Sequence, residues 1–218
     1  MKYLENTKDT LLAQLSREIM LDLETAIQIH GQAHILLSGG TTPKPLYELM
    51  NDEMDKLDQI EIGLIDERFV ANDHPQSNLG LLRNCFKRKP NMVKGMVYHQ
   101  ENQENNLIYL KKEYQLFTER TDVGLLGMGT DGHFASIFPN DIESQEALST
   151  DIPFLNTNSP GEPKDRITCS LNFICSIKNL YLLISGKEKK AVLQNPNLNL
   201  PIHALLKRRS DINVFYFD

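Results

Sequence analysis

The sequence lacks the features of membrane-spanning and secreted proteins. No stretch approaches the roughly 18 consecutive apolar residues that a membrane helix needs, and the first ten residues contain no apolar core of a signal peptide. The chain has only three cysteines, and this odd number without a CxxC pair gives no disulfide framework. We therefore expect a soluble, unprocessed protein of a reducing compartment, which we take to be the cytoplasm, with no membrane partner.

Positive charge and several common motifs are also scarce. The 218 residues carry a formal net charge of -6 at pH 7, whereas binding to a nucleic-acid backbone usually requires a basic surface. The sequence contains no HExxH, paired CxxC or P-loop motif. We expect no nucleic-acid partner, catalytic metal, nucleotide or cofactor. A small anionic substrate still fits this composition, because a few local cations are enough to hold it, and no feature indicates an oligomeric state.

The apolar residues alternate between short runs and helical stripes. Seven runs are predicted as strands, at residues 33–37, 60–65, 92–97, 123–128, 167–171, 180–184 and 214–217. Helices are predicted at residues 7–30, 43–50, 78–86 and 104–118, from near Gly132, and at 188–193 and 202–207. The polar stretches 140–166 and 195–201 are predicted as loops. The alternation predicts βαβ units, a largely parallel sheet and one α/β domain spanning residues 1–218.

Polar residues follow several of these strands, and the first such group follows the run at 33–37. Ligands of parallel α/β sheets bind beyond the carboxyl ends of the strands, so these positions carry functional weight. Backbone N–H groups of a glycine turn that opens a helix can hold a phosphate. The group consists of Ser38, Gly39, Gly40, Thr41 and Thr42, with Pro43 in the first helical turn. The alternative is an ordinary glycine turn in which a threonine caps the helix.

A second group, Asp66, Glu67 and Arg68, ends the predicted strand at 60–65. The planar guanidinium of Arg68 can grip a phosphate or a carboxylate through parallel N–H donors. A polar loop then leads to Ser77 and Asn78 at the start of the next helix. The alternative interpretation is a solvated cluster of salt bridges.

The third group places a carboxylate and an imidazole in a glycine turn after the strand at 123–128. Asp131 and His133 flank Gly132 in this turn, and Gly129 precedes them. Histidine is the usual general base near neutral pH, and a neighbouring carboxylate can fix its tautomer and stabilise its charged form. The alternative is a structural histidine.

The same turn also spells GxGxxG through Gly127, Gly129 and Gly132, which marks a dinucleotide site in other contexts. Asp131 would repel the pyrophosphate, and this fingerprint normally occupies the first βα turn of a fold. We therefore regard the dinucleotide interpretation as the weaker one.

Two cationic segments lie in the C-terminal part of the sequence. Arg166 opens the predicted strand at 167–171, so sheet geometry alone does not place it in the site. Lys187, Lys189 and Lys190 follow the strand at 180–184, and we interpret two of these three as solvated charges.

Together these segments resemble the 6-phosphogluconolactonase family, a branch of the glucosamine-6-phosphate deaminase-like superfamily. The resemblance rests on SGGTTP at 38–43, DER at 66–68 with SN at 77–78, GMGTDGHFASIFP at 127–139, RIT at 166–168 and residues 186–189. It covers essentially the whole chain, and the Asp-Gly-His block is its most specific part. It implies a three-layer α/β fold, with a modified Rossmann-like, mostly parallel sheet and helices on both faces, and a role in the oxidative pentose phosphate pathway.

The resemblance also implies roles for individual residues. His133 would be the general base that activates water for hydrolysis of 6-phospho-D-glucono-1,5-lactone, and Asp131 would support it. The phosphate would be held by the loop at 38–42 together with Arg166 and Lys189. The implied substrate contacts are Ser38, Gly39, Gly40, Thr41, Thr42, Asp66, Arg68, Gly129, Arg166 and Lys189.

Two residues depart from the family pattern, and two other functions stay open. Phe134 stands where the family commonly has a small hydroxyl residue, and Thr41 replaces the more usual serine. Deaminases of the superfamily carry a carboxylate a few residues beyond the histidine, whereas residues 135–139 contain no acid, which favours the lactonase. The alternatives are a glucosamine-6-phosphate deaminase or isomerase and a non-catalytic sugar-phosphate-binding domain. Sensors of the second kind usually carry a helix-turn-helix, for which the N-terminal segment is too short.

Overall fold

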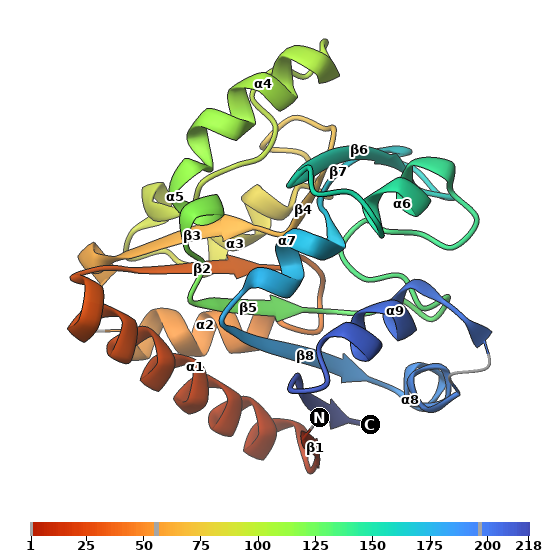
Figure 1. Cartoon of the computed structure of the whole chain (residues 1–218). Coiled ribbons are helices and arrows are strands. Elements are labelled where there is room, and N and C mark those ends of the chain that lie inside the picture. The colour runs from red at the N-terminus through yellow and green to blue at the C-terminus, as the bar shows by residue number, and fades with distance from the viewer. Residues whose placement is uncertain (1, 55–56, 196–197) are drawn as a thin grey trace.

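The computed structural model describes residues 2–54, 57–195 and 198–218, and its centre is a six-stranded parallel sheet (Figure 1). The strands follow the order β1-β9-β8-β5-β2-β3, and every neighbouring pair is parallel. Their bounds are Lys2–Glu5 (β1), Ala33–Leu37 (β2), Ile60–Leu64 (β3), Val123–Leu126 (β5), Asn179–Ser185 (β8) and Asn213–Phe217 (β9). Because all strands point the same way, their carboxyl ends share one edge of the sheet.

Helices cover both faces of this sheet, which confirms the predicted three-layer α/β fold (Figure 1). One face carries α1 (Lys8–His30) and α2 (Lys44–Glu53), and α3 (Asn78–Cys85) packs against α2. The other face carries α5 (Gln115–Glu119), which follows α4 (Gln103–Glu113), together with α7 (Leu171–Ser176) and α9 (Pro201–Arg208). Helix α8 (Lys187–Gln194) begins where β8 ends. None of the described helices is long and apolar enough to cross a membrane.

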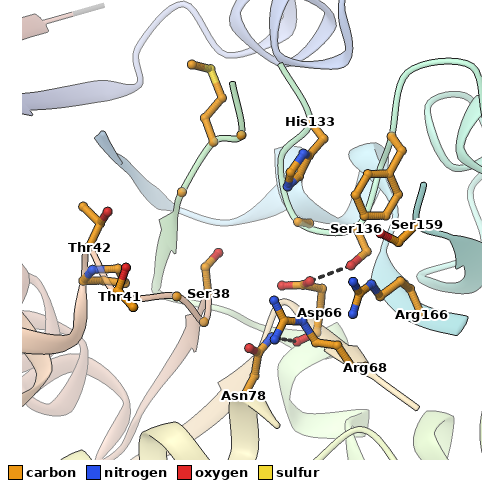
Figure 2. Close-up of a pocket in the computed structure, with 18 of the residues that line it drawn as sticks. Ser38, Thr41, Thr42, Asp66, Arg68, Asn78, His133, Ser136, Ser159 and Arg166 are labelled. Atoms are coloured by element: carbon orange, nitrogen blue, oxygen red, sulfur yellow. Dashed lines mark hydrogen bonds between the residues drawn. The ribbon is translucent and has the colours of Figure 1, made fainter. Parts of the chain in front are cut away.

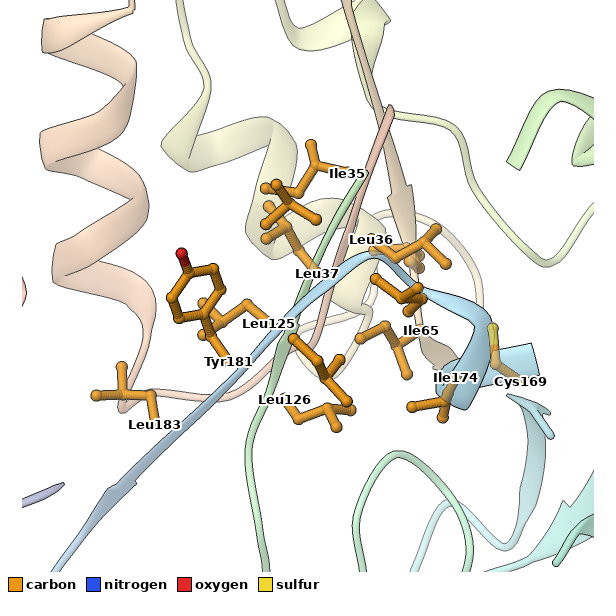
Figure 3. Packing of buried hydrophobic residues seen from close by; sticks show 14 of the residues in the cluster. Ile35, Leu36, Leu37, Ile65, Leu125, Leu126, Cys169, Ile174, Tyr181 and Leu183 are labelled. Atoms are coloured by element: carbon orange, nitrogen blue, oxygen red, sulfur yellow. The ribbon is translucent and has the colours of Figure 1, made fainter. Parts of the chain in front are cut away.

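The core is built from the two apolar faces of the sheet (Figure 3). Leu125, Tyr181 and Leu183 lie on the α1 side, whereas Ile174 of α7 lies on the other side. The predicted apolar stripe of α1 is buried, and the helix ends at Gly31, whose φ of 79° suits glycine. Burial on both faces explains why β2, β3, β5, β8 and β9 could be recognised as short apolar runs, whereas the more exposed β1 was not predicted.

A second, smaller sheet is antiparallel and stands beside the carboxyl ends of the parallel strands. Its order is β4-β7-β6, with β4 at Asp66–Arg68, β6 at Phe154–Asn158 and β7 at Asp165–Cys169. Arg68 and Arg166 are direct partners in the β4–β7 register. This sheet, with α6 (Ile142–Ala147) packed on β6, was not predicted.

Several predicted elements are wrong. Residues 92–97 form no strand, because a 3-10 turn at Pro90–Met92 precedes a single bridge from Val93 to Ile62 and the rest is irregular. No helix begins near Gly132, because the positive φ angles of Gly132 (78°) and Ala135 (49°) interrupt a helical path.

Other predicted bounds need smaller corrections. The predicted loop at 140–166 contains α6 and β6, and the strand predicted at 167–171 is β7 of the antiparallel sheet. The helix predicted at 104–118 is divided at Tyr114 into α4 and α5. A second 3-10 turn, Leu57–Gln59, precedes β3. Of the loop predicted at 195–201, residues 196 and 197 lie outside the described residues, and Pro201 already begins α9.

Candidate active site

A cavity of about 340 Å³ opens between the carboxyl ends of the parallel strands and the antiparallel sheet. Figure 2 shows Thr41 and Thr42 on one side and Arg68 and Arg166 on the other, with His133 above the space between them. Of the predicted site residues, the cavity is lined by Ser38, Gly39, Gly40, Thr41, Thr42, Asp66, Arg68, Gly129, His133, Arg166 and Lys189. The structure therefore brings together residues that are up to 151 positions apart (189 minus 38).

The glycine loop after β2 lines the cavity and has unbonded backbone donors. Within the described part of the chain, the backbone N–H groups of residues 39–42 make no hydrogen bond. A Cβ on Gly39 would collide with the amide of Asn78, and Gly40 has a φ of 102°. Pro43 precedes the first turn of α2, so the positive end of that helix lies beside the same loop. Free N–H groups at a helix start form a phosphate cradle.

Arg166 is the cation on the opposite side of the cavity. Only 6% of its surface is exposed, and its Nε and Nη1 atoms have no partner among the described residues. Burial, and then the charge of Arg68, lower the pKa of Arg166 to about 10, so the guanidinium still carries its charge at neutral pH. A buried guanidinium without a protein partner indicates a binding site for an anion.

Asp66, Glu67 and Arg68 have three different environments. Asp66 accepts a hydrogen bond of 2.6 Å from the Ser136 hydroxyl at the cavity wall. Arg68 also lines the cavity, and its Nη1 donates to the carbonyl of Gln76. No ion pair joins these three side chains in the described structure, and both acids are buried, so they are not a solvated salt-bridge cluster.

Glu67 does not line the cavity and instead holds the start of α3. Its carboxylate accepts the N–H groups of Arg68, Asn78 and Leu79, each at 2.8 Å, and the hydroxyl of Ser77 at 3.1 Å. Burial raises its pKa, although these backbone hydrogen bonds act in the opposite direction. Glu67 thus fixes Asn78, whose side chain lines the cavity.

The turn after β5 forms a hydrogen-bonded carboxylate–imidazole pair. Asp131 Oδ1 lies 2.5 Å from Nδ1 of His133 and also accepts the His133 backbone N–H at 3.2 Å. Burial raises the pKa of Asp131, but the hydrogen bond and charge of His133 outweigh it, and the net pKa is lowered. An ionised carboxylate only accepts hydrogen bonds, so Nδ1 carries the proton and Nε2 is left to accept one.

Two neighbours fix this pair. A Cβ on Gly129 would lie 2.3 Å from the His133 ring, so only glycine allows the ring to rest against that backbone. On another side, the Phe138 ring lies 4.7 Å from the imidazole between centroids. Asp131 itself does not line the cavity and reaches it through His133.

Of lysines 187, 189 and 190, one lines the cavity, one is exposed and one forms an ion pair elsewhere. Lys189 lines the cavity and is half-buried, and burial lowers its pKa although Asp131 raises it. Lys187 is exposed. Lys190 instead pairs with Glu5 at 2.7 Å and lies over the Tyr216 ring. The described residues contain no group of three or more His, Cys, Asp or Glu side chains arranged to hold a metal ion.

Several lining residues were missed from the sequence. Ser136 and Phe138 belong to the quoted GMGTDGHFASIFP block, so their position was the available signal. Ser159 lies just beyond β6, in a stretch whose composition indicated only a loop, and nothing pointed to it. The remaining missed lining residues are Pro43, Asn78, Gly127, Met128, Ala135 and Leu183.

Comparisons with known proteins are consistent with one family. Residues 6–212 match the family model described as glucosamine-6-phosphate isomerases/6-phosphogluconolactonase. The 6-phosphogluconolactonase of Pseudomonas putida is 31% identical over 212 residues, covering 93% of this chain and 88% of the relative. That of Nostoc sp. is 32% identical over 195 residues, covering 84% and 79%. A crystal structure of a 6-phosphogluconolactonase from Shewanella baltica superposes with a TM-score of 0.89 at 27% identity, covering 100% and 98%.

Proposed function

Because this chain belongs to the family of glucosamine-6-phosphate isomerases and 6-phosphogluconolactonases, we propose that it is a 6-phosphogluconolactonase in which His133 is the general base. It hydrolyses 6-phospho-D-glucono-1,5-lactone to 6-phosphogluconate, a step of the oxidative pentose phosphate pathway. The observation that carries the proposal is that His133, hydrogen-bonded to Asp131, lines the same cavity as the unpartnered guanidinium of Arg166. Base and anion site therefore share one pocket.

His133 acts first as a base and then as an acid. Its Nε2 takes a proton from water as the water oxygen attacks the lactone carbonyl, and Asp131 stabilises the imidazolium that forms. The tetrahedral intermediate collapses when the bond from carbon to the ring oxygen breaks, and the imidazolium returns the proton to that oxygen. The sum of these steps is the addition of one water molecule, and His133 is regenerated.

The phosphate is held by donors from both sides of the cavity. The free N–H groups of residues 39–42, with the hydroxyls of Ser38, Thr41 and Thr42, form one side, and Arg166 and Lys189 supply the charge. The Ser38 hydroxyl is buried without a partner in the described structure, as a ligand contact would require. Asp66, Arg68 and Gly129 contact the sugar part of the substrate.

The partner of this protein is thus a small sugar-phosphate lactone, and we place the protein in the cytoplasm. A reducing compartment is supported by the cysteines Cys85, Cys169 and Cys175, which are all unpaired thiols.

The test is the loss of 6-phosphogluconolactone, generated in place by glucose-6-phosphate dehydrogenase. Because this lactone also hydrolyses spontaneously, wild type is compared with an enzyme-free blank. His133→Ala should lower kcat by about 10²- to 10⁴-fold, the usual contribution of a general base. The matched control is His30→Ala, at the exposed end of α1, which should match wild type.

Two outcomes contradict the proposal. If wild type does not accelerate hydrolysis over the blank, the lactonase assignment fails, and release of ammonia from glucosamine 6-phosphate becomes the next measurement. If His133→Ala keeps the wild-type kcat, the reaction stands but His133 is not its base.

A further inference from the structure

The first turn of helix α9 contains a histidine whose two ring nitrogens are both hydrogen-bonded. His203 is the third residue of α9, and its Nδ1 lies 3.1 Å from the backbone nitrogen of Leu200, the N-cap. Its Nε2 lies 3.0 Å from the carbonyl oxygen of Val192 in α8. Because the Leu200 N–H donates to Nδ1, that nitrogen carries no proton, and Nε2–H donates to Val192. These two bonds hold the ring in one orientation.

The first of these bonds connects His203 to the catalytic turn. The hydrogen bond to Leu200 is one half of a capping box, which fixes how the chain enters α9. Two residues at this helix start contact Gly132. The Ile202 N–H donates to the Gly132 carbonyl at 3.0 Å, and the Leu200 side chain packs so closely that a Cβ on Gly132 would lie 2.7 Å from it. Gly132 directly precedes His133. The start of α9 thus supports the backbone that carries the proposed base.

The second bond connects His203 to the proposed phosphate site. Val192 lies one helical turn after Lys189 on α8, and Lys189 lines the cavity. Figure 1 shows α8 and α9 at the edge of the sheet where β5 and β8 end. His203 itself does not line the cavity.

We propose that His203 is a positioning residue that sets the geometry between the His133 turn and the Lys189 helix. This inference rests on the proposed function, in which the first segment carries the general base and the second carries a phosphate-binding lysine. A displacement of about 1 Å at a catalytic group can cost on the order of 10²-fold in rate, so a bridge outside the cavity can matter for turnover.

The bridge needs the Nδ1 atom of His203 as the hydrogen-bond acceptor for the Leu200 N–H. The hollow beside His203 is also lined by Tyr3 of β1, Lys207 of α9, and Leu193 and Gln194.

Three variants test the proposal in the lactonase assay. His203→Ala removes both bonds and should lower kcat about tenfold and raise KM. His203→Gln should restore most of the activity, because glutamine at this position of a capping box also accepts the N-cap N–H. The control is Lys207→Ala, one turn further along the exposed side of α9, which should match wild type. Equal kcat and KM in His203→Ala and wild type would overturn the proposal.

One further measurement separates positioning from general stability.

Amide hydrogen exchange provides a readout that does not need activity. His203→Ala should speed exchange in peptides covering residues 127–137 and 187–194, with no change at 33–37. If wild type proves inactive, the proposed function fails, but the exchange pattern still tests whether His203 holds these two segments together. Faster exchange across the whole chain would instead show general destabilisation and refute it.

Discussion

Two histidine–aspartate pairs lie at opposite edges of the parallel sheet, and they differ in what else reaches the carboxylate. At the amino edge, Asp122 accepts the backbone N–H of His34 at 2.8 Å and pairs with Arg120 at 3.2 Å. At the carboxyl edge, Asp131 binds the His133 ring itself, and no arginine or lysine pairs with it in the described structure.

The consequence is a difference in chemistry between identical residue types. The His34 ring is 2% exposed, and its Nδ1 is bound to the carbonyl of Arg120, so solvent and ligands do not reach it. His133 lines a cavity, and the carboxylate of Asp131 has no other ion-pair partner in the described structure. The first pair ties strands together, whereas the second lies at the proposed active site.

Exchanging each carboxylate for an amide gives the largest expected contrast. Asp131→Asn should lower kcat by on the order of 10³-fold, because the amide no longer stabilises the imidazolium or its tautomer. Asp122→Asn should leave kcat unchanged and cost about 1–3 kcal/mol in the free energy of unfolding, because it weakens buried bonds. Steady-state kinetics and denaturant unfolding of both variants measure this contrast. Equal losses of kcat in the two would abolish the distinction between the edges.

The cations give a smaller contrast. Arg166→Ala should raise KM for the lactone about tenfold or more, because a hydrogen bond between charged groups is lost. Lys190→Ala is the matched control, since Lys190 lies next to Lys189 in sequence but pairs with Glu5 outside the cavity. KM from initial rates decides the question, and an unchanged KM in Arg166→Ala would remove that residue from the phosphate site.

The smallest effect concerns acid stability. The lowered pKa of Asp131 means that its interaction with His133 stabilises the fold above the unfolded-state pKa of about 3.9 and is lost as pH falls through the lower folded value. The Tm advantage of wild type over Asp131→Asn should therefore shrink below about pH 4. Melting curves from pH 3 to 7 measure it. A difference that stays constant across this range contradicts the assigned shift.

The two sheets also differ in how well the sequence predicted them. The buried parallel strands are continuous apolar runs, so β2 was predicted with its observed bounds. In the antiparallel sheet only β7 was predicted as a strand, because β4 has three residues and β6 (FLNTN) lies in a polar stretch. The buried run at 92–97 was wrongly predicted as a strand, because burial alone does not distinguish a strand from an irregular segment.

The site was predictable where glycine and charge follow a parallel strand. Strand geometry explains the positions of His133 and the loop at 38–42, whereas strand geometry alone did not place Arg166 in the site. Arg166 enters the cavity because β7 runs antiparallel to β4, which places the start of β7 beside Arg68. Its inclusion came from the family resemblance alone.

The register that aligns Arg68 with Arg166 links ligand concentration to folding. Two guanidiniums side by side repel each other, and burial adds to the cost of the Arg166 charge. An anion bound there compensates this cost only in the folded chain, so it shifts the unfolding equilibrium by mass action. A phosphate ester at 100 times its Kd would add about 2.7 kcal/mol to the free energy of unfolding. The resistance of this protein to unfolding would then vary with the supply of its own substrate and product.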